Sequence, residues 1–295
     1  MEINNIVNYN TFMKLTFLGT GTSHGIPVIG CDCPVCTSNN PKDNRNRASV
    51  YLCTDDDKYI LVDIGPEFRI QAIKYKVKKV DALLLTHSHA DHLHGIDDLR
   101  IFSADCFKKS EKNASIVDAP PIPVYTNENT IKDVETRFSY FFRHAKEGGG
   151  HAKVTLNKAT GNFKIGSTTI TPIPMEHGST KTCGWLFNHN GSSLAYLTDC
   201  SFISEESFEL IRKNKGNLKH IVIDGLREKP HSTHFSFLEA MAAAEKIGAE
   251  NVWLTHLTHH HSHDETNKYI QQHLKDFPKL TKNTAAAWDG LELEF

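Results

Sequence analysis

Short apolar runs separated by polar turns recur along most of the chain. Runs of a few residues that end at glycine, proline or aspartate predict β-strands, and the longer segments between them predict helices. The predicted strands cover residues 14–18, 49–54, 59–63, 80–86, 122–126, 153–156, 168–173, 182–188, 193–198, 220–224 and 251–255, and the predicted helices cover 66–76, 93–102, 128–143, 205–213, 235–247 and 264–275.

Strand-rich halves with interspersed helices favour two sheets packed together and covered outside by helices, an α/β architecture. A chain of 295 residues can bury one large core, and we expect a single domain over 14–295. Residues 1–13 carry no periodic pattern and are expected to form an irregular extension, with Met1 or Met13 as the natural start. The polar, lysine-rich stretch at about 103–121 is expected to be an exposed insertion.

Three histidines and one aspartate lie together just after the apolar run Leu83-Leu84-Leu85. His87 and His89 are expected to project to the same side of the turn that follows this strand. Asp91 and His92 fall in the first turn of the next helix, close to the first pair but pointing elsewhere. Imidazole is the commonest protein ligand of zinc-like ions, and a carboxylate suits a second, harder ion. The turn therefore predicts donors for two adjacent metals.

Composition and charge narrow the classes of function. Hydrophobic content of 39% and charged content of 23% are ordinary for a globular protein, and no apolar run approaches the roughly 20 residues that span a bilayer. Residues 1–10 lack a basic segment followed by an apolar core, so the expected location is the cytoplasm. A net charge of -2 disfavours non-specific nucleic-acid binding without excluding a local basic pocket.

Three of the seven cysteines crowd into the segment Cys31-Asp-Cys33-Pro-Val-Cys36. In a chain without an export signal, such clustering favours metal binding over disulfides.

Further donors are expected at strand ends, where a rigid sheet can hold them. His177, Asp199 and His256 each follow a predicted strand and are candidate ligands. Asp63 and Asp224 also end apolar strands. They are predicted to orient ligand imidazoles from behind, with a helix cap or turn aspartate as the alternative.

The pattern HxHxDH behind a hydrophobic strand, followed in order by His, Asp and His at later strand ends, resembles the metallo-β-lactamase superfamily of binuclear hydrolases. The resemblance implies a four-layer αββα sandwich. It also implies a nucleophilic water or hydroxide between two ions, which lower the pKa of water from 15.7 toward about 7. By this resemblance, one metal would be held by His87, His89 and His177. The other would be held by Asp91, His92 and His256, and Asp199 would bridge the two. Asp91 and Asp199 would then be catalytic residues.

Other motifs resemble the PhnP-like family of carbon-phosphorus lyase accessory phosphodiesterases, from residue 14 to 258. The resemblance implies hydrolysis of cyclic or linear phosphodiesters with two active-site ions, Zn or Mn. It also implies a separate structural zinc held by the cysteine trio and a later histidine. The motifs are Leu18-Gly-Thr-Gly-Thr-Ser23, Gly30-Cys-Asp-Cys-Pro-Val-Cys36, Arg45-Asn-Arg47, Asp63-Ile-Gly-Pro66, Gly95-Ile-Asp-Asp-Leu-Arg100 and His231-Ser-Thr-His234.

Three thiolates cannot complete a tetrahedral zinc site, so a fourth donor is needed. His259, three residues after His256, is the favoured donor to join Cys31, Cys33 and Cys36. The alternatives are His260, His261 and His263.

His234 is predicted to protonate the leaving oxygen or to bind phosphate. It precedes a helix expected from residue 235, where a protonated imidazole would stabilise developing negative charge. An ordinary core histidine is the alternative. Arg45 and Arg47 are predicted to clamp phosphate oxygens, with a solvated basic pair as the alternative.

Two other functions stay open. A tRNA 3′-end processing endonuclease (tRNase Z-like) shares the LGTG strand and HxHxDH, but it grips tRNA with a long basic arm, and the stretch 103–121 is short and of mixed charge. A cofactor-biosynthesis accessory protein, like the pyrroloquinoline quinone pathway member, would lack catalytic ligands, and none is missing from this sequence. The expected partner is a small phosphodiester, with a homodimer left open and no membrane.

Overall fold

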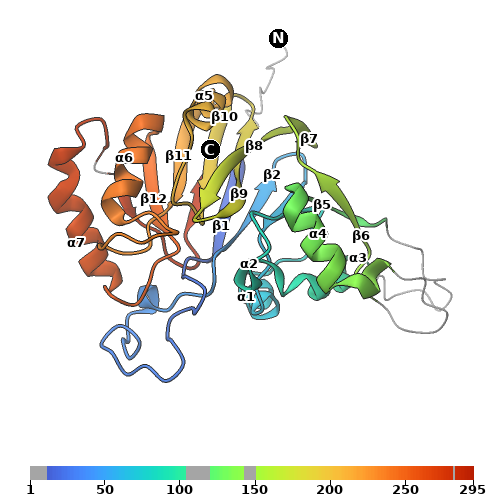
Figure 1. Ribbon diagram of the computed structural model, residues 1–295, viewed down its shortest axis with the longest axis horizontal. Helices are drawn as coiled ribbons and strands as arrows, with labels where there is room; N and C mark the ends of the chain where they lie inside the picture. The colour runs from blue at the N-terminus through green and yellow to red at the C-terminus, as the bar shows by residue number, and fades with distance from the viewer. Residues whose placement is uncertain (1–11, 104–119, 143–150, 282) are drawn as a thin grey trace, which may run out of the picture.

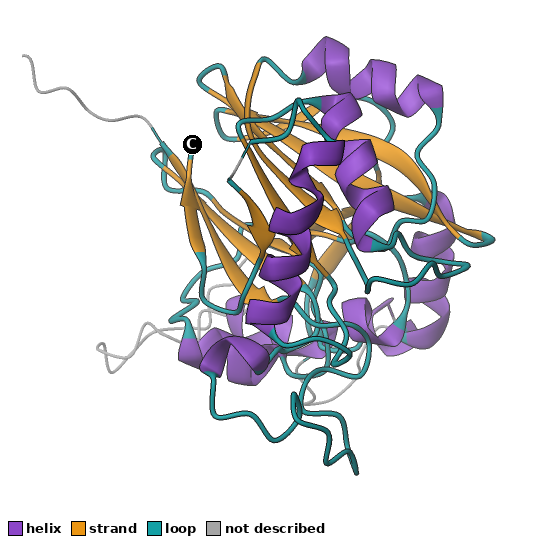
Figure 2. Cartoon of the chain, turned by 90° about the vertical axis from the view of Figure 1, so that its left-hand side faces the viewer, coloured by secondary structure: helices purple, strands orange, loops and turns teal. Residues whose placement is uncertain are grey.

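The computed structural model describes residues 12–103, 120–142, 151–281 and 283–295. Within them, two seven-stranded sheets stack face to face with helices on both outer faces, so the predicted αββα sandwich is confirmed (Figures 1 and 2). In spatial order, the first sheet contains β14 (Glu292–Glu294), β1 (Met13–Gly19), β2 (Ser49–Thr54), β3 (Tyr59–Val62), β4 (Ala82–Leu84), β5 (Ile122–Thr126) and β6 (Val154–Lys158). The second contains β13 (Thr284–Ala286), β12 (Asn251–Thr255), β11 (Asn217–Asp224), β10 (Ser192–Leu197), β9 (Thr180–His189), β8 (Thr168–His177) and β7 (Phe163–Ile165).

The helices fall into two groups, one for each sheet. Helices of the first half pack on the first sheet, and those of the second half pack on the second (Figure 1). The first group is α1 (Phe68–Lys74), α2 (Ala90–Leu93), α3 (Arg100–Ser103) and α4 (Glu128–Arg137), and the second is α5 (Glu205–Asn214), α6 (Phe237–Ile247) and α7 (His263–His273). Short 3-10 turns lie at η1 (Pro41–Asp43), η2 (Ile96–Leu99), η3 (Ser139–Phe142) and η4 (Leu274–Asp276).

Three apolar layers hold the sandwich together. Because successive side chains of a strand point to opposite faces, Leu83 packs in the layer under α1, whereas Leu84 packs between the sheets. Trp185 and Tyr196 are fully buried between the sheets. The strands that carry the candidate ligands are therefore fixed on both faces.

Parallel pairing brings the functional turns to one edge. Strands β3, β4, β5 and β6 pair in parallel in the first sheet, and β10, β11, β12 and β13 do so in the second. Parallel neighbours end at the same edge of a sheet. The turns that follow β3, β4, β10, β11 and β12 can therefore meet.

Several predicted elements differ from the observed ones. The predicted helix 93–102 is three short pieces, α2, η2 and α3. Gly95, between the first two, packs so closely on Gly65 that a Cβ there would lie 2.1 Å from the Gly65 carbonyl oxygen. Strand β8 extends to His177 instead of ending at residue 173. Met13 is not part of an irregular extension but begins β1, where it is buried and pairs with Thr54.

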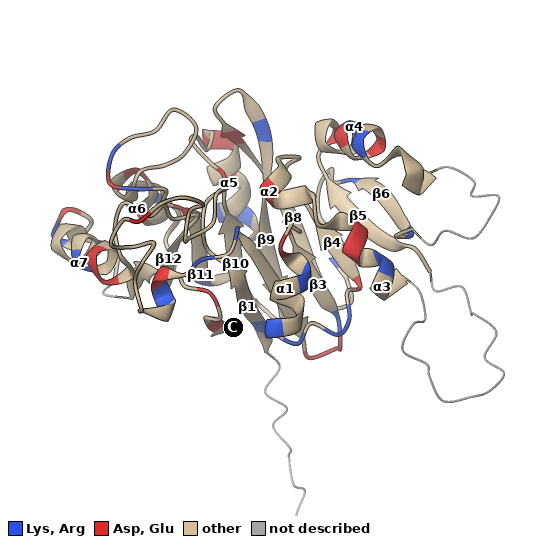
Figure 3. Cartoon of the chain, turned by 90° about the horizontal axis from the view of Figure 1, so that it is seen from below, with Lys and Arg blue, Asp and Glu red and all other residues tan. Residues whose placement is uncertain are grey.

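Three short strands, β7, β13 and β14, were not predicted. Each has three residues and is placed by its neighbour in a sheet rather than by its own pattern. Most of the predicted insertion at 103–121 lies outside the described residues. Among the described helices, none is both long and apolar enough to cross a bilayer. Acidic and basic residues are interspersed over the elements seen from below (Figure 3).

Candidate metal centre

The turn after β4 carries the first four candidate ligands. His87 is buried and His89 is exposed, and their ring centroids lie 4.4 Å apart. Helix α2 begins directly after His89, so that Asp91 and His92 lie in its first turn, where both are buried. The His92 ring lies 4.5 Å from the His87 ring. A single turn thus presents two pairs of donors in different directions.

The remaining ligands arrive from the second sheet. His177 is the last residue of β8, Asp199 follows β10, and His256 follows β12. Asp199 and His256 adopt positive φ values of 54° and 61°, a conformation that non-glycine residues adopt rarely and that clusters at functional sites. This backbone turns both side chains back over the strand ends toward the first sheet.

Seven donors form two sets that meet at one carboxylate. Donor atoms within each set lie within 4.8 Å of one another. Asp199 stands between the sets, with Oδ1 4.0 Å from Nε2 of His87 and Oδ2 3.1 Å from Nε2 of His92. The sets are His87, His89 and His177 on one side, and Asp91, His92 and His256 on the other.

The donors fit divalent metal ions. Nε2 of His87, His92 and His256 is buried without a hydrogen-bond partner, and buried polar atoms are ordinarily paired. Nε2 of His256 lies 3.4 Å from Asp199 and 3.7 Å from Asp91, within reach of an ion that all three could bind. Nitrogen and carboxylate donors in this number suit zinc or manganese.

Electrostatics leads to the same conclusion. Burial opposes a charged imidazole, and it holds the pKa of His87 well below its ordinary value. At His92 the nearby carboxylates of Asp199, Asp91 and Asp63 outweigh burial and hold the pKa well above its ordinary value. The carboxylates thus require positive charge between them, which bound cations would supply.

Asp63 lies directly behind the candidate ligand His92. Its Oδ2 is 2.7 Å from Nδ1 of His92, and its other oxygen accepts the Thr86 backbone N–H at 2.8 Å. Burial raises the pKa of Asp63, although hydrogen bonds oppose that rise. The contact leaves Nε2 of His92 as the nitrogen directed at the donor cluster.

Asp224 lies behind His234 rather than behind one of the seven predicted metal ligands. Its Oδ2 is 2.6 Å from Nδ1 of His234, which was predicted to protonate the leaving oxygen or to bind phosphate. The His234 ring lies 4.4 Å from the His177 ring and 4.8 Å from the His256 ring. Burial lowers the pKa of His234. Helix α6 begins at Phe237, two residues later than predicted, so His234 lies in the loop before it.

The cysteine trio and His259 form a second centre. Nδ1 of His259 lies 3.4 Å from Sγ of Cys31, 3.5 Å from Cys33 and 3.3 Å from Cys36. Tetrahedral zinc with ordinary bond lengths places sulfur and nitrogen about 3.6 Å apart. The Cys36 backbone N–H contacts the Cys33 sulfur and lowers the pKa of Cys33 to about 6, which favours the thiolate that zinc binds.

The three alternative histidines have other neighbours. Nδ1 of His260 contacts the Thr258 hydroxyl at 2.7 Å, His261 faces Glu228 at 3.4 Å, and Nδ1 of His263 faces Arg45 at 3.3 Å. The structure therefore brings His259 alone of these four histidines to the cysteine sulfurs.

The prediction that Arg45 clamps substrate phosphate is wrong. Arg45 is buried, and its guanidinium donates to the Thr20 hydroxyl at 2.8 Å and to the Ala287 carbonyl at 2.6 Å. Arg47 is occupied too, because it pairs with Glu67 at 2.6 Å and donates to the Ser23 carbonyl at 2.7 Å. Both arginines hold loops together.

Sequence analysis missed Arg227, which lies three residues after Asp224 and is only partly buried. Its positive charge adds to the effect of burial in lowering the pKa of His231, His234 and His260. Its Nε donates to the Lys229 carbonyl at 3.3 Å. Its position just after the strand that ends at Asp224 could have identified Arg227, because the other candidate functional residues also follow strand ends.

Comparisons with known proteins agree with this geometry. Residues 58–257 match the model of the β-lactamase superfamily domain. The solved structure of a diphosphatase from the PhnP family is 36% identical, has a TM-score of 0.79, and covers 96% of this chain and 97% of its own. The probable metallo-hydrolase YhfI of Bacillus subtilis is 25% identical over 90% of this chain and 99% of its own length.

A protein named octanoyltransferase from Porphyromonas gingivalis is 32% identical over 95% of this chain. The match covers 51% of that protein, so the present chain spans about half the length of this relative.

Proposed function

The chain belongs to the β-lactamase superfamily of metallo-hydrolases, and from that membership we propose that it hydrolyses a small cyclic or linear phosphodiester. The observation that carries the proposal is the convergence of seven donors in two sets around Asp199, with His234 beside them. The similarity to a PhnP-family diphosphatase supports a substrate that is cleaved at a phosphorus–oxygen bond.

Divalent ions held by the two donor sets would supply Lewis-acid charge and an activated water. We propose one ion for each set, Zn or Mn, and a structural zinc at Cys31, Cys33, Cys36 and His259. Asp199 is placed to contact both sets, and Asp91 completes the second one. Asp63 holds the His92 ring in position through Nδ1.

His234 supplies the proton that the reaction needs. Hydrolysis adds the hydroxyl of water to phosphorus and breaks the bond to the ester oxygen, which must then gain a proton. The imidazolium form of His234 carries a proton on each ring nitrogen: Nδ1 lies 2.6 Å from the Asp224 carboxylate, which leaves Nε2 as the nitrogen that can protonate the leaving oxygen. His234 then regains a proton from solvent.

Arg227 takes the phosphate-binding role that was predicted for Arg45 and Arg47. Its positive charge adds to the effect of burial in lowering the pKa of His234, and the residue is partly exposed. An arginine there suits a non-bridging phosphate oxygen or a second anionic group. His231, at a ring distance of 5.4 Å from His234, lines the same approach.

The test is a substrate screen on protein loaded separately with Zn and Mn. We expect turnover of bis(p-nitrophenyl) phosphate and of at least one cyclic nucleotide, and loss of turnover after chelation. Filter binding of tRNA at physiological salt is the counter-assay. Submicromolar tRNA binding without hydrolysis of small diesters would favour the tRNA endonuclease, and inactivity on both with loaded sites would defeat the hydrolase proposal.

A further inference from the structure

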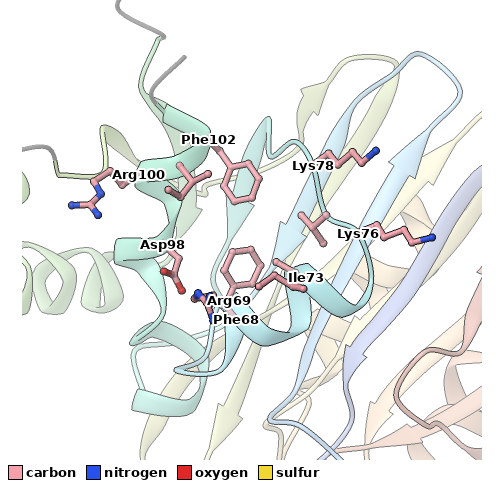
Figure 4. A pocket seen from close by; sticks show the side chains of 11 residues that line it. Phe68, Arg69, Ile73, Lys76, Lys78, Asp98, Arg100 and Phe102 are labelled. Carbon is pink, nitrogen blue, oxygen red and sulfur yellow. The ribbon is translucent and has the colours of Figure 1, made fainter. Parts of the chain in front are cut away.

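A large cavity lies apart from both metal centres. It has a volume of about 940 Å³, is open to solvent on one side, and is bordered by α1, the turn at residues 76–78, and the segment from η2 to α3 (Figure 4). None of the residues that line it belongs to either donor set or to the cysteine site. Pockets of roughly 300 to 1,000 Å³ commonly hold a small organic ligand.

The interior of the cavity is apolar. The rings of Phe68 and Phe102 lie 6.2 Å apart at its wall, and Figure 4 shows both turned toward the same space as Ile73. Ile73 is 65% exposed and Ile101 is 40% exposed, although both line the cavity. Isoleucines left in water at a concave surface favour a ligand that covers them.

The rim of the cavity is mainly basic. Its charged residues are four cations and one carboxylate. Lys76 and Lys78 extend at one side of the opening, and Arg69 lies beside Asp98 at the other (Figure 4). Excess positive charge around an apolar interior attracts anions and stabilises them at the opening. The cations are Arg69, Lys76, Lys78 and Arg100, and the carboxylate is Asp98.

We propose that this cavity binds a small amphipathic anion, an acyl chain of medium length that ends in a carboxylate. The chain would lie against Phe68, Ile73 and Phe102, and the carboxylate would meet the lysines of the rim. The lining favours a ligand with both parts. An apolar molecule without charge leaves Lys76 and Lys78 without an anion, and a short acid leaves the isoleucines exposed.

The walls of the cavity continue directly from the metal turn. The Ile64 backbone N–H donates to the His92 carbonyl at 2.7 Å, and the Gly95 N–H donates to the Ile64 carbonyl at 2.9 Å. Helix α1 follows the first of these segments and η2 follows the second. Binding is therefore measured on the metal-loaded protein, because metal binding at His92 could affect the position of the segments that border the cavity.

The probes for calorimetry are decanoate, butyrate and decyltrimethylammonium, all below their micelle concentrations. We expect one decanoate per chain, with butyrate and the cation bound at least tenfold more weakly. Ile73→Glu places a carboxylate in the cavity and should weaken decanoate binding at least tenfold. Ile70→Glu is the matched control, because Ile70 lies on the same helix, is 60% exposed and does not line the cavity.

A second pair of variants tests the rim. Lys78→Glu should weaken decanoate several-fold, whereas Lys79→Glu, one residue away and outside the lining, should not. Circular dichroism checks that each variant is folded. Equal decanoate affinity in Ile73→Glu and wild type would overturn the proposal, since the acid would then bind elsewhere, for example at the metals.

Two further outcomes would also overturn it. A dimer that is lost in Ile73→Glu, without decanoate binding, would make the cavity an interface between copies of the chain. Binding to phosphatidylglycerol vesicles without binding of free decanoate would make it a membrane-contacting surface.

Discussion

Nδ1 of His92 lies 2.7 Å from Oδ2 of Asp63, and neither side chain is exposed to solvent. Asp63 itself adopts a positive φ of 58°, which turns its carboxylate from the end of β3 toward the metal turn after β4. The contact joins two neighbouring strands of the first sheet at the point where the donors begin. It determines which nitrogen of His92 is available to a metal.

Asp63→Asn should weaken metal binding 10- to 100-fold, because a second-sphere carboxylate orients the imidazole and raises its basicity. Competition with a chelator of known affinity measures this change. Asp81→Asn is the control, since Asp81 accepts the Tyr59 backbone N–H at 2.9 Å and pairs with Lys79 at 3.2 Å, and neither partner is a candidate ligand. Equal metal affinity in Asp63→Asn and wild type would remove the assigned role.

Cys33→Ser should lose one metal per chain and much of its stability, because a structural zinc contributes folding free energy. Elemental analysis and thermal unfolding measure the two effects. Cys53→Ser, at a half-buried cysteine of β2 outside the trio, should keep all its metal. An unchanged zinc content in Cys33→Ser would show that the cysteine site does not bind zinc.

Asp199→Asn should abolish turnover, because the amide cannot neutralise the charge of two ions as the carboxylate does. Asparagine tolerates the positive φ of this position, so the loss measures charge rather than backbone strain. Steady-state kinetics on bis(p-nitrophenyl) phosphate tests the change. Activity above about 1% of wild type, a loss under about 2.7 kcal/mol in transition-state stabilisation, would be hard to reconcile with bridging.

His234→Ala should lose roughly 10² to 10⁴-fold on a cyclic ribose phosphodiester, whose alkoxide leaves poorly without a proton. The loss on the nitrophenyl ester should be much smaller, because nitrophenolate barely needs a proton. Both active-site metals should stay bound. Equal losses on both substrates with metals retained would assign phosphate binding to His234, and loss of metal would make it a ligand. His273→Ala, at a partly exposed histidine at the end of α7 and outside both donor sets, is the control variant.

His263 should make stability depend on pH. Burial, and then the charge of Arg45, lower the pKa of His263 to about 4 in the folded chain, below the ordinary value of 6.5. As pH falls below 6.5, His263 therefore takes up a proton in the unfolded chain before it does so in the folded chain. The stability that neutral His263 contributes is present above about pH 6.5 and is lost as pH falls toward 4.

Urea unfolding at several pH values checks this dependence. His263→Gln should flatten the slope of stability against pH between 6.5 and 4 by up to about 1.4 kcal/mol per pH unit, the value of one proton. The same substitution at partly exposed His273 is the comparison. Parallel slopes in His263→Gln and wild type would rule the contribution out.

Short-range patterns in the sequence were sufficient for much of the fold and for the first four candidate ligands. The bounds of β2 and β5 are those predicted, because β2 is an almost continuously buried run and β5 alternates between buried and half-buried positions. The spacing in the turn from His87 to His92 similarly determines how its donors project, since all four donors lie within one strand end and one helical turn. Such features depend on neighbours in the chain.

Only the tertiary structure decided the contacts between distant segments. His259 is separated from Cys31 by 228 residues, and several histidines beside it were chemically equivalent in the sequence. Arg45 was predicted to bind phosphate, but in the folded chain its guanidinium is buried and donates to the Thr20 hydroxyl and the Ala287 carbonyl. The physical reason is that side-chain chemistry is local, whereas burial and the choice of partner depend on which strands the sheets bring together.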